Sequence, residues 1–321
     1  MAAKRTAKGV APRMGQFWPR RSLSVGRIFP AKYRSAQIRP GPGRIGVCTA
    51  QALSTMLTLS KPLSWIEALR YYREELQNAH LNYYLPIVSS WHGQLARNWG
   101  LDKTVTEDTF AAVAAGRDPR TGTVLVDDLR SHTDIPRAIA HRAGWDATVS
   151  APISVSLTAL VGGDLRIHDA HRASVRTCLD ELERFTQARI GGNHPPETTG
   201  RWIAALFEHD SARPAEDDYA APQLHTHVLV FNITTDSTGE ARPLKSRELY
   251  RSQQYATAVY LNELGYRLRG WGYELDRGAR GRFELSGYTA AYLAACRPEG
   301  VQLRRRAIES LRRLRGADRD S

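Results

Sequence analysis

The sequence predicts a mixed α+β domain, and three patterns support this prediction. Two strand-like runs, residues 202–207 and 223–232, follow one another in the second half of the chain. Before them, apolar residues recur every three or four positions across residues 170–190, which is the spacing of an amphipathic helix. Earlier still, Ser64-Trp-Ile-Glu67 has the form of a capping box. Helix and strand patterns therefore alternate along the chain.

The elements of the first half can be placed in order. The capping box opens a helix that carries Tyr71 and Tyr72. Residues 146–150 have the pattern of a strand, and Pro152, just after them, suits the first turn of a following helix.

The second half continues with helices and a hairpin. The amphipathic helix is expected to end at residues 191–193, Gly-Gly-Asn. A polar loop over residues 210–221 joins the two strand-like runs, and residues 246–270 have a helical pattern. Residues 273–285 resemble a short hairpin with glycines in its turn, and residues 301–315 resemble a basic helix.

Two histidines stand one residue apart in the second strand-like run. In an extended strand, His225 and His227 leave the same face. His209 follows the first run, so pairing of the two strands as a hairpin places it beside the other two. Three neutral imidazoles with open positions describe a catalytic metal site. The alternative is a hydrogen-bonded or solvated pair. Five other histidines have no stronger claim than surface or helix-face residues; these are His92, His141, His168, His171 and His194.

Two tyrosine pairs lie upstream of the histidines. Tyr71-Tyr72 belongs to the capped helix, whereas Tyr83-Tyr84 lies near a proline in a segment expected to form a turn. Such a pair on a helix ordinarily packs half in the core. Together with an acidic residue and the histidines, however, phenols form a set suited to phosphoryl transfer.

The excess charge is concentrated in the first 55 residues. They contain eleven basic residues and no acidic one, so subtracting eleven from the net charge of +12 leaves +1 for the rest. We therefore expect residues 1–55 to be a disordered basic arm, or a mis-assigned start. Three scattered cysteines indicate a reducing compartment. No apolar stretch is long enough for a membrane helix, which predicts a soluble, cytoplasmic protein without a membrane partner.

Several separate motifs, colinear from about residue 56 to about residue 306, give the chain a family resemblance. It resembles the relaxase domain of MobF-class (F-plasmid-type) conjugative relaxases, members of the HUH endonuclease group. Besides the two tyrosine pairs, the matching stretches are Gly-Trp-Asp-Ala-Thr-Val-Ser-Ala-Pro-Ile-Ser-Val-Ser at 144–156, Gly-Gly-Asp-Leu-Arg at 162–166, His-Asp-Ala-His at 168–171, Phe-Glu-His-Asp-Ser at 207–211 and Pro-Gln-Leu-His-Thr-His at 222–227.

The resemblance implies a central antiparallel palm sheet of the HUH type with flanking helices, and a helical C-terminal region that closes over DNA. It implies metal-dependent nicking and strand transfer of single-stranded DNA at a transfer origin in conjugation, through a 5′-phosphotyrosine. The expected partners are single-stranded DNA at a transfer-origin hairpin, a separate helicase and a coupling protein. We therefore expect residues 56–321 to form the relaxase domain, and we expect no helicase domain in this sequence.

The resemblance also assigns roles. Tyr71, the first residue of the pair Tyr71-Tyr72, would start the reaction, and Tyr83 or Tyr84 would serve the second transfer. Asp146 matches the family's acidic residue and would accept the phenolic proton or orient a histidine; both roles stay open. The resemblance implies one divalent ion, Mg or Mn, on the three histidines, whereas imidazole ligands also suit Zn.

The chain departs from the family pattern in places. Ile153 stands where a lysine usually follows Ser-Ala-Pro, and the spacings between the tyrosine pairs and between His209 and His225 are longer than usual. Three alternatives therefore remain: a rolling-circle replication initiator with the same chemistry, a catalytically decayed DNA-binding module, and a three-histidine metal hydrolase unrelated to DNA.

Overall fold

The computed structural model describes most of one compact unit of the chain, Leu53–Ser321. The expected basic arm, the second tyrosine pair and the expected helix over residues 301–315 lie outside the described residues. The residues that it describes are 56–77, 88–101, 104–126, 142–212 and 221–296.

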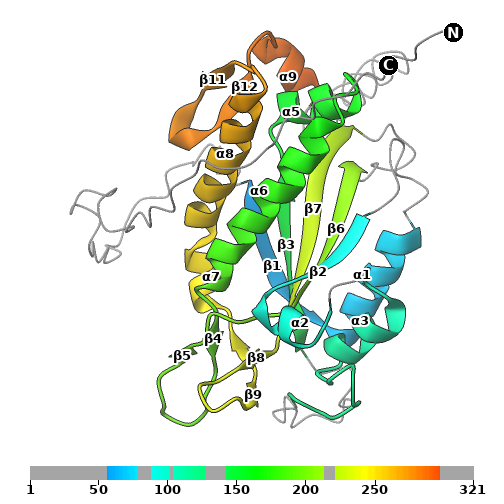
Figure 1. Cartoon of the computed structure of the whole chain (residues 1–321), viewed down its shortest axis with the longest axis vertical. Helices are drawn as coiled ribbons and strands as arrows, with labels where there is room; N and C mark the ends of the chain where they lie inside the picture. Colours follow the sequence, from blue (N-terminus) through cyan, green and yellow to red (C-terminus); the bar gives the residue numbers. More distant parts are fainter. Residues whose placement is uncertain (1–55, 78–87, 102–103, 127–141, 213–220, 297–321) are drawn as a thin grey trace, which may run out of the picture. The chain divides into compact units, whose positions relative to one another are not determined.

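The core of the fold is a five-stranded sheet in the order β1-β3-β7-β6-β2. All four ladders are antiparallel, and β7 is the central strand (Figure 1). The predicted α+β class with an antiparallel sheet is thus confirmed, as are the strand over residues 146–150 and the two strands that carry the histidines. The strands are β1 (Leu57–Ser64), β2 (Val88–His92), β3 (Arg142–Ser150), β6 (Ala204–Ser211) and β7 (Pro222–Phe231).

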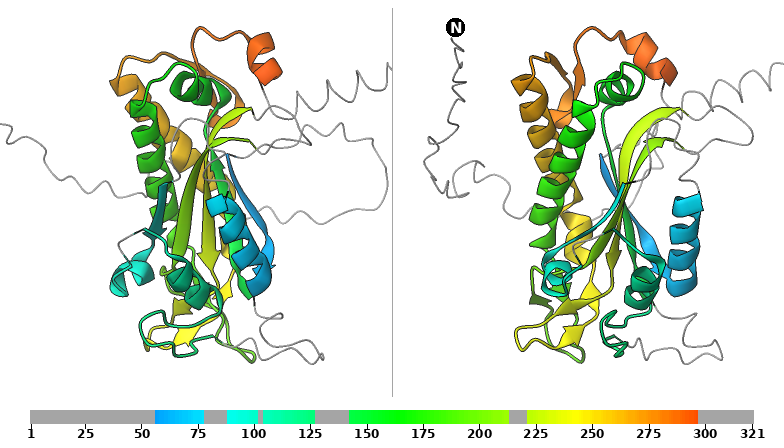
Figure 2. Two further views of the ribbon diagram at one scale, coloured as in Figure 1. Left: turned by 90° about the vertical axis from the view of Figure 1, so that its right-hand side faces the viewer. Right: turned by 45° about the vertical axis from the view of Figure 1, so that its right-hand side comes forward.

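Helices cover both faces of this sheet (Figure 2). Helices α6 (Arg166–Glu183) and α8 (Gln253–Gly270) pack on one face, and α1 (Trp65–Gln77) and α3 (Glu107–Ala114) pack on the other. Successive residues of β7 belong alternately to the two cores, because side chains along a strand point to opposite faces. The histidine face is therefore covered in part by a second core that contains α1, and is not simply open.

Helix α1 begins where the capping box predicts. The Ser64 backbone N–H donates to the Glu67 carboxylate at 2.7 Å, and the Glu67 N–H donates to the Ser64 hydroxyl oxygen at 3.3 Å. These reciprocal bonds satisfy two backbone groups that a helix start leaves without partners. They fix where the helix begins and therefore which residues face the sheet.

Helix α6 is shorter at its C-terminal end than its apolar spacing predicts. It ends at Glu183, and the expected end at residues 191–193 is wrong. Residues after it form strand β4 (Gln187–Ala188), which pairs with β10 (Leu244–Lys245) and β5 (Glu197–Thr198). These long-range ladders satisfy the backbone in place of helical hydrogen bonds. Pro152 immediately precedes helix α5 (Ile153–Leu160) and does not occupy its first turn.

The remaining elements complete the unit. The helical pattern over residues 246–270 is confirmed, with a break at Ser252 between two helices. The predicted hairpin is confirmed, with a one-turn helix in its connection. Among the described residues no helix is long and apolar enough to cross a membrane. The remaining bounds are α2 (Gln94–Asn98), β8 (Thr234–Thr235), β9 (Ala241–Arg242), α7 (Arg247–Arg251), β11 (Leu275–Arg277), η4 (Ala279–Gly281), β12 (Phe283–Leu285) and α9 (Ala290–Cys296).

Candidate active site

Three histidine rings meet on the two strands at the middle of the sheet. His209 on β6 pairs directly with His225 on β7, and His227 follows two residues along β7. The ring centroids of His209 lie 5.3 Å from those of both His225 and His227, and the latter two are 4.9 Å apart. The predicted hairpin thus brings all three candidate ligands together.

The rings are largely shielded from water. His209 and His225 are buried, and His227 is half-buried. Burial, with the neighbouring His227 adding to it, lowers the pKa of His225 well below its ordinary value. The Nδ1 atom of His225 lies 2.9 Å from the Gln223 carbonyl oxygen, which can only accept a hydrogen bond. Nδ1 of the neutral ring therefore carries the proton, and Nε2 keeps its lone pair for a ligand.

Asp146 contacts His227 from the neighbouring strand β3. Both carboxylate oxygens of Asp146 lie 3.3 Å from Nδ1 of His227. The Thr148 hydroxyl lies at the same distance, 3.3 Å, from that nitrogen. A carboxylate that accepts the Nδ1 proton fixes the ring's orientation and leaves Nε2 as the donor atom, as in carboxylate–histidine–metal arrangements.

Tyr71 reaches the same carboxylate from helix α1. Its hydroxyl donates to Asp146 Oδ1 at 3.4 Å, and its ring lies edge-on to His227 with centroids 5.6 Å apart. Long contacts of this kind in an enzyme without its substrate often shorten when the reacting groups bind. The structure therefore brings Tyr71, Asp146 and the three histidines into one site.

Tyr72 lies apart from this group. It is buried in the core, where its ring stacks on Phe110 at a centroid distance of 4.4 Å. Its hydroxyl donates to the Val105 carbonyl oxygen at 3.3 Å, and burial raises its pKa. Adjacent residues of a helix point in directions about 100° apart, so only one member of the pair can face the histidines. The second pair, Tyr83-Tyr84, lies outside the described residues.

The sequence reasoning undervalued two histidines of helix α6. His168 and His171 are buried rather than at the surface, and both make hydrogen bonds to groups on other elements. Their burial could have been predicted from their spacing of three residues, because this spacing places both on one side of a helix that has an apolar face. Their partners, Glu208 and Thr226, could be recognised only once the strand register was known.

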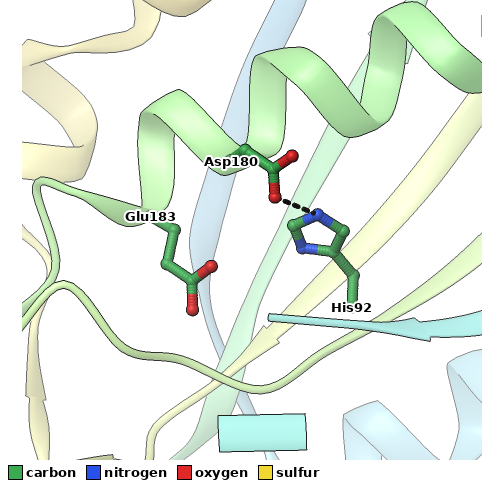
Figure 3. A group of neighbouring side chains, drawn as sticks. All are labelled: His92, Asp180 and Glu183. Atoms are coloured by element: carbon green, nitrogen blue, oxygen red, sulfur yellow. Dashed lines mark ion pairs between the residues drawn. The ribbon is translucent and has the colours of Figure 1, made fainter. Parts of the chain in front are cut away.

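A second histidine–carboxylate group joins β2 to α6 (Figure 3). The ligand atoms of His92, Asp180 and Glu183 lie within 4.8 Å of one another, so they could hold a metal ion. Their hydrogen bonds favour a structural tie instead. His92 Nε2 lies 3.1 Å from Asp180, and the Trp202 indole N–H donates to Nδ1 at 3.4 Å. An Nδ1 that accepts leaves the proton on Nε2, where a metal would have to displace it.

A helix-covered antiparallel sheet with clustered histidines on its central strands and a tyrosine above them is the architecture of the HUH endonuclease group. Within that group the chain matches the TrwC relaxase family over residues 66–319, and it belongs to this family. The MobF-class resemblance read from the motifs is thereby confirmed.

Relatives agree with this assignment. The Escherichia coli multifunctional conjugation protein TraI is 34% identical over 220 residues, which is 64% of this chain. The chain spans only 12% of the length of that relative. A metal-bound structure of the conjugative relaxase TrwC in complex with oriT DNA superposes with a TM-score of 0.67 at 31% identity, covering 79% of this chain and 83% of the other. A copper-bound TrwC–oriT complex gives 0.64 at 29% identity, covering 81% and 84%.

Proposed function

We propose that this chain is a conjugative relaxase that nicks one DNA strand at a transfer origin by transesterification and can rejoin it. Membership of the TrwC relaxase family supports the proposal, as does the likeness to TrwC structures bound to oriT DNA. The observation that carries it is the hydrogen-bonded line from the Tyr71 hydroxyl through Asp146 to His227, beside two further histidines.

Tyr71 supplies the nucleophile. Its phenolic oxygen attacks the phosphorus of one phosphodiester, a new P–O bond to the tyrosine forms, and the bond to the 3′ oxygen breaks. The products are a 5′-phosphotyrosine and a 3′-hydroxyl that takes its proton from solvent. Since the number of phosphoester bonds is unchanged, the strand can be closed again by the reverse attack.

Asp146 is placed to assist this attack. A free tyrosine has a pKa near ~10 and is a weak nucleophile at neutral pH. The Asp146 carboxylate accepts the hydrogen bond from the Tyr71 hydroxyl and can take the phenolic proton as the new bond forms. Its second contact holds the His227 ring. One carboxylate thus both activates the tyrosine and orients a histidine.

One divalent metal ion fits the histidine cluster. His209, His225 and His227 would hold it, because their rings are within contact of one another and the orientation of at least His225 leaves Nε2 available. When bound, such an ion neutralises non-bridging phosphate oxygens and orients the phosphate. Imidazole donors suit Zn, whereas Mg or Mn would need more oxygen ligands from phosphate and water.

Further assignments concern the rest of the chain. Residues 56–321 act as the relaxase domain, and residues 1–55 lie outside it. The substrate is single-stranded DNA beside a transfer-origin hairpin, and the reaction takes place in the cytoplasm. Tyr83 or Tyr84 serves a second transfer. A helicase and a coupling protein complete the machinery. The rolling-circle alternative is not favoured, because the matched family and the solved relatives are conjugative relaxases.

The direct test is capture of the covalent intermediate. The full chain is incubated with Mn²⁺ and single-stranded DNA that spans a candidate transfer origin, and products are separated under denaturing conditions. A protein–DNA adduct with a matching free 3′ end is expected. Free 5′ and 3′ ends without an adduct would instead indicate a hydrolase and overturn the proposal.

A further inference from the structure

Polar side chains of helix α6 contact strands β6 and β7 on the face of the sheet opposite the histidine cluster. On the β6–β7 ladder, Glu208 pairs directly with Thr226. Residues opposite one another in an antiparallel pair share a face of the sheet. Glu208 and Thr226 therefore point towards α6, on the face away from the three histidines. Each of the three histidines is covalently adjacent to one of these two residues.

Thr226 is held by a buried chain of hydrogen bonds. Its hydroxyl lies 2.9 Å from Nε2 of His171, and Nδ1 of that ring lies 2.8 Å from the Tyr260 hydroxyl on α8. All three residues are buried, and His171 and Tyr260 are 0% exposed. In such a dry environment, a hydrogen bond that is broken leaves its groups without water as a substitute partner.

Glu208 is held in the same way on the other strand. Its carboxylate accepts from Arg172 at 2.6 Å and 3.0 Å, and it lies 3.0 Å from Nδ1 of His168. The Glu208 side chain is only 8% exposed, so its charge is shielded and its contacts are stronger than those of a surface pair.

We propose that Glu208 and Thr226 are positioning residues. Their hydrogen bonds to side chains of α6 fix the position of the backbone that carries the three candidate metal ligands. This role assigns a purpose to the His168–His171 motif, which the proposed reaction does not use. It rests on the proposed function, because it concerns the same metal site. These residues are joined to the histidines by single peptide bonds. A shift of Thr226 therefore moves both His225 and His227, and a shift of Glu208 moves His209.

The variant Thr226→Val tests this role, because it keeps the β-branched shape and removes the hydroxyl. Thr226→Ser restores the hydroxyl and serves as the rescue variant. The matched control is Thr234→Val, since Thr234 is also buried and its hydroxyl donates to the Arg201 carbonyl oxygen at 2.7 Å. Thr234 belongs to β8, outside the five-stranded sheet. Glu208→Gln probes the second strand if the threonine variant does not fold.

The readout is binding of Mn²⁺ alone to the metal-free full chain, by calorimetry, and the visible spectrum of bound Co²⁺. Groups that orient metal ligands typically contribute about 10–100-fold to affinity, so Thr226→Val should weaken Mn²⁺ binding about tenfold and alter the Co²⁺ spectrum. Thr226→Ser and Thr234→Val should bind like the wild type. Glu208→Gln should weaken binding in the same direction.

The outcomes separate this role from the proposed function. If the wild type binds Mn²⁺ and Thr226→Val and Glu208→Gln bind equally well, the positioning role is overturned and the proposed function stands. If Thr234→Val weakens binding as much as Thr226→Val, the effect is general destabilisation and the role is again overturned. A wild type that binds neither ion would overturn both.

Discussion

His209 and His225 lie directly opposite one another on the β6–β7 ladder, and their rings stack with centroids 5.3 Å apart and 26° between their planes. The register of the β6–β7 ladder fixes the relative position of these two residues, whereas the length of the connecting loop does not. A longer loop adds only a slowly growing closure entropy. The unusually long spacing between the two histidines therefore leaves the cluster intact.

Replacement of Tyr71 by phenylalanine should abolish the covalent adduct. The change removes only the attacking oxygen, so the adduct should fall by orders of magnitude while DNA affinity remains. Denaturing gels and mass spectrometry of the peptide–DNA adduct check this. Tyr72→Phe is the matched control: it should still nick, and loss of its buried bond to Val105 should lower the free energy of unfolding by about 1 kcal/mol. Adduct found mainly on Tyr83 or Tyr84 in the wild type would contradict the assignment.

Asp146→Asn should slow nicking by roughly 10²–10⁴-fold, the usual contribution of a positioned proton acceptor. The amide cannot take the phenolic proton. Raising the pH should recover part of the rate, because the phenol then ionises without help. Single-turnover rates across pH measure this. A variant that shows no recovery at high pH but binds metal more weakly would assign Asp146 to orienting His227 alone.

Removal of the metal should stop nicking by the wild type. His225→Ala should have the same effect at all metal concentrations, since it deletes one of the three candidate ligands. The control is His194→Ala, because His194 is exposed in the loop between β4 and β5. Adduct formation is measured with and without a chelator, and restored by adding Mn²⁺. Full activity in the presence of the chelator would contradict the three-histidine assignment.

The metal-free protein should lose stability in mild acid. Burial lowers the pKa of His171 from its ordinary value of 6.5 to about 4. The unfolded chain therefore takes up a proton at a pH where the folded chain resists it. This stability is fully present above pH 6.5 and is lost as the pH falls towards 4.

Between pH 6.5 and pH 4, the lowered pKa of His171 contributes about 3 kcal/mol to the loss in the free energy of unfolding. Denaturant unfolding at a series of pH values measures it. His225, whose pKa is also lowered, adds to the total in the same direction. His171→Leu should therefore show a weaker dependence on pH than the wild type. Equal slopes for the two proteins would show that His171 does not resist protonation.

A chain that begins at Met56 should fold and nick. Strand β1 begins at Leu57, and the Met56 carbonyl oxygen accepts a hydrogen bond from Ser150 at 2.9 Å. Removal of eleven positive charges should weaken salt-sensitive, non-specific DNA affinity only. Circular dichroism, nicking and DNA binding at two salt concentrations test this. Loss of folding or nicking would make residues 1–55 part of the functional domain.

Local patterns predicted much of this site. Alternation along a strand places His225 and His227 on one face, and the hairpin brings His209 to them. The contact between Tyr71 and Asp146 required more, because it depends on how α1 packs against β3. The partners of His168 and His171 depend on strand register, which no local pattern contains. The prediction of where α6 ends was wrong for the same reason, because residues 187–188 pair as a strand with residues 244–245, far along the chain.

The central position of β7 has a thermodynamic consequence. A strand with neighbours on both sides exchanges its amide protons only through large-scale opening, so the histidines on it separate only when most of the sheet unfolds. Metal occupancy and folding are therefore linked equilibria. An ion held at 100 times its Kd would add about 2.7 kcal/mol to the free energy of unfolding. Amide exchange along β6 and β7 should slow together when the ion is added, and a metal-starved cell would hold this protein nearer to its unfolding threshold.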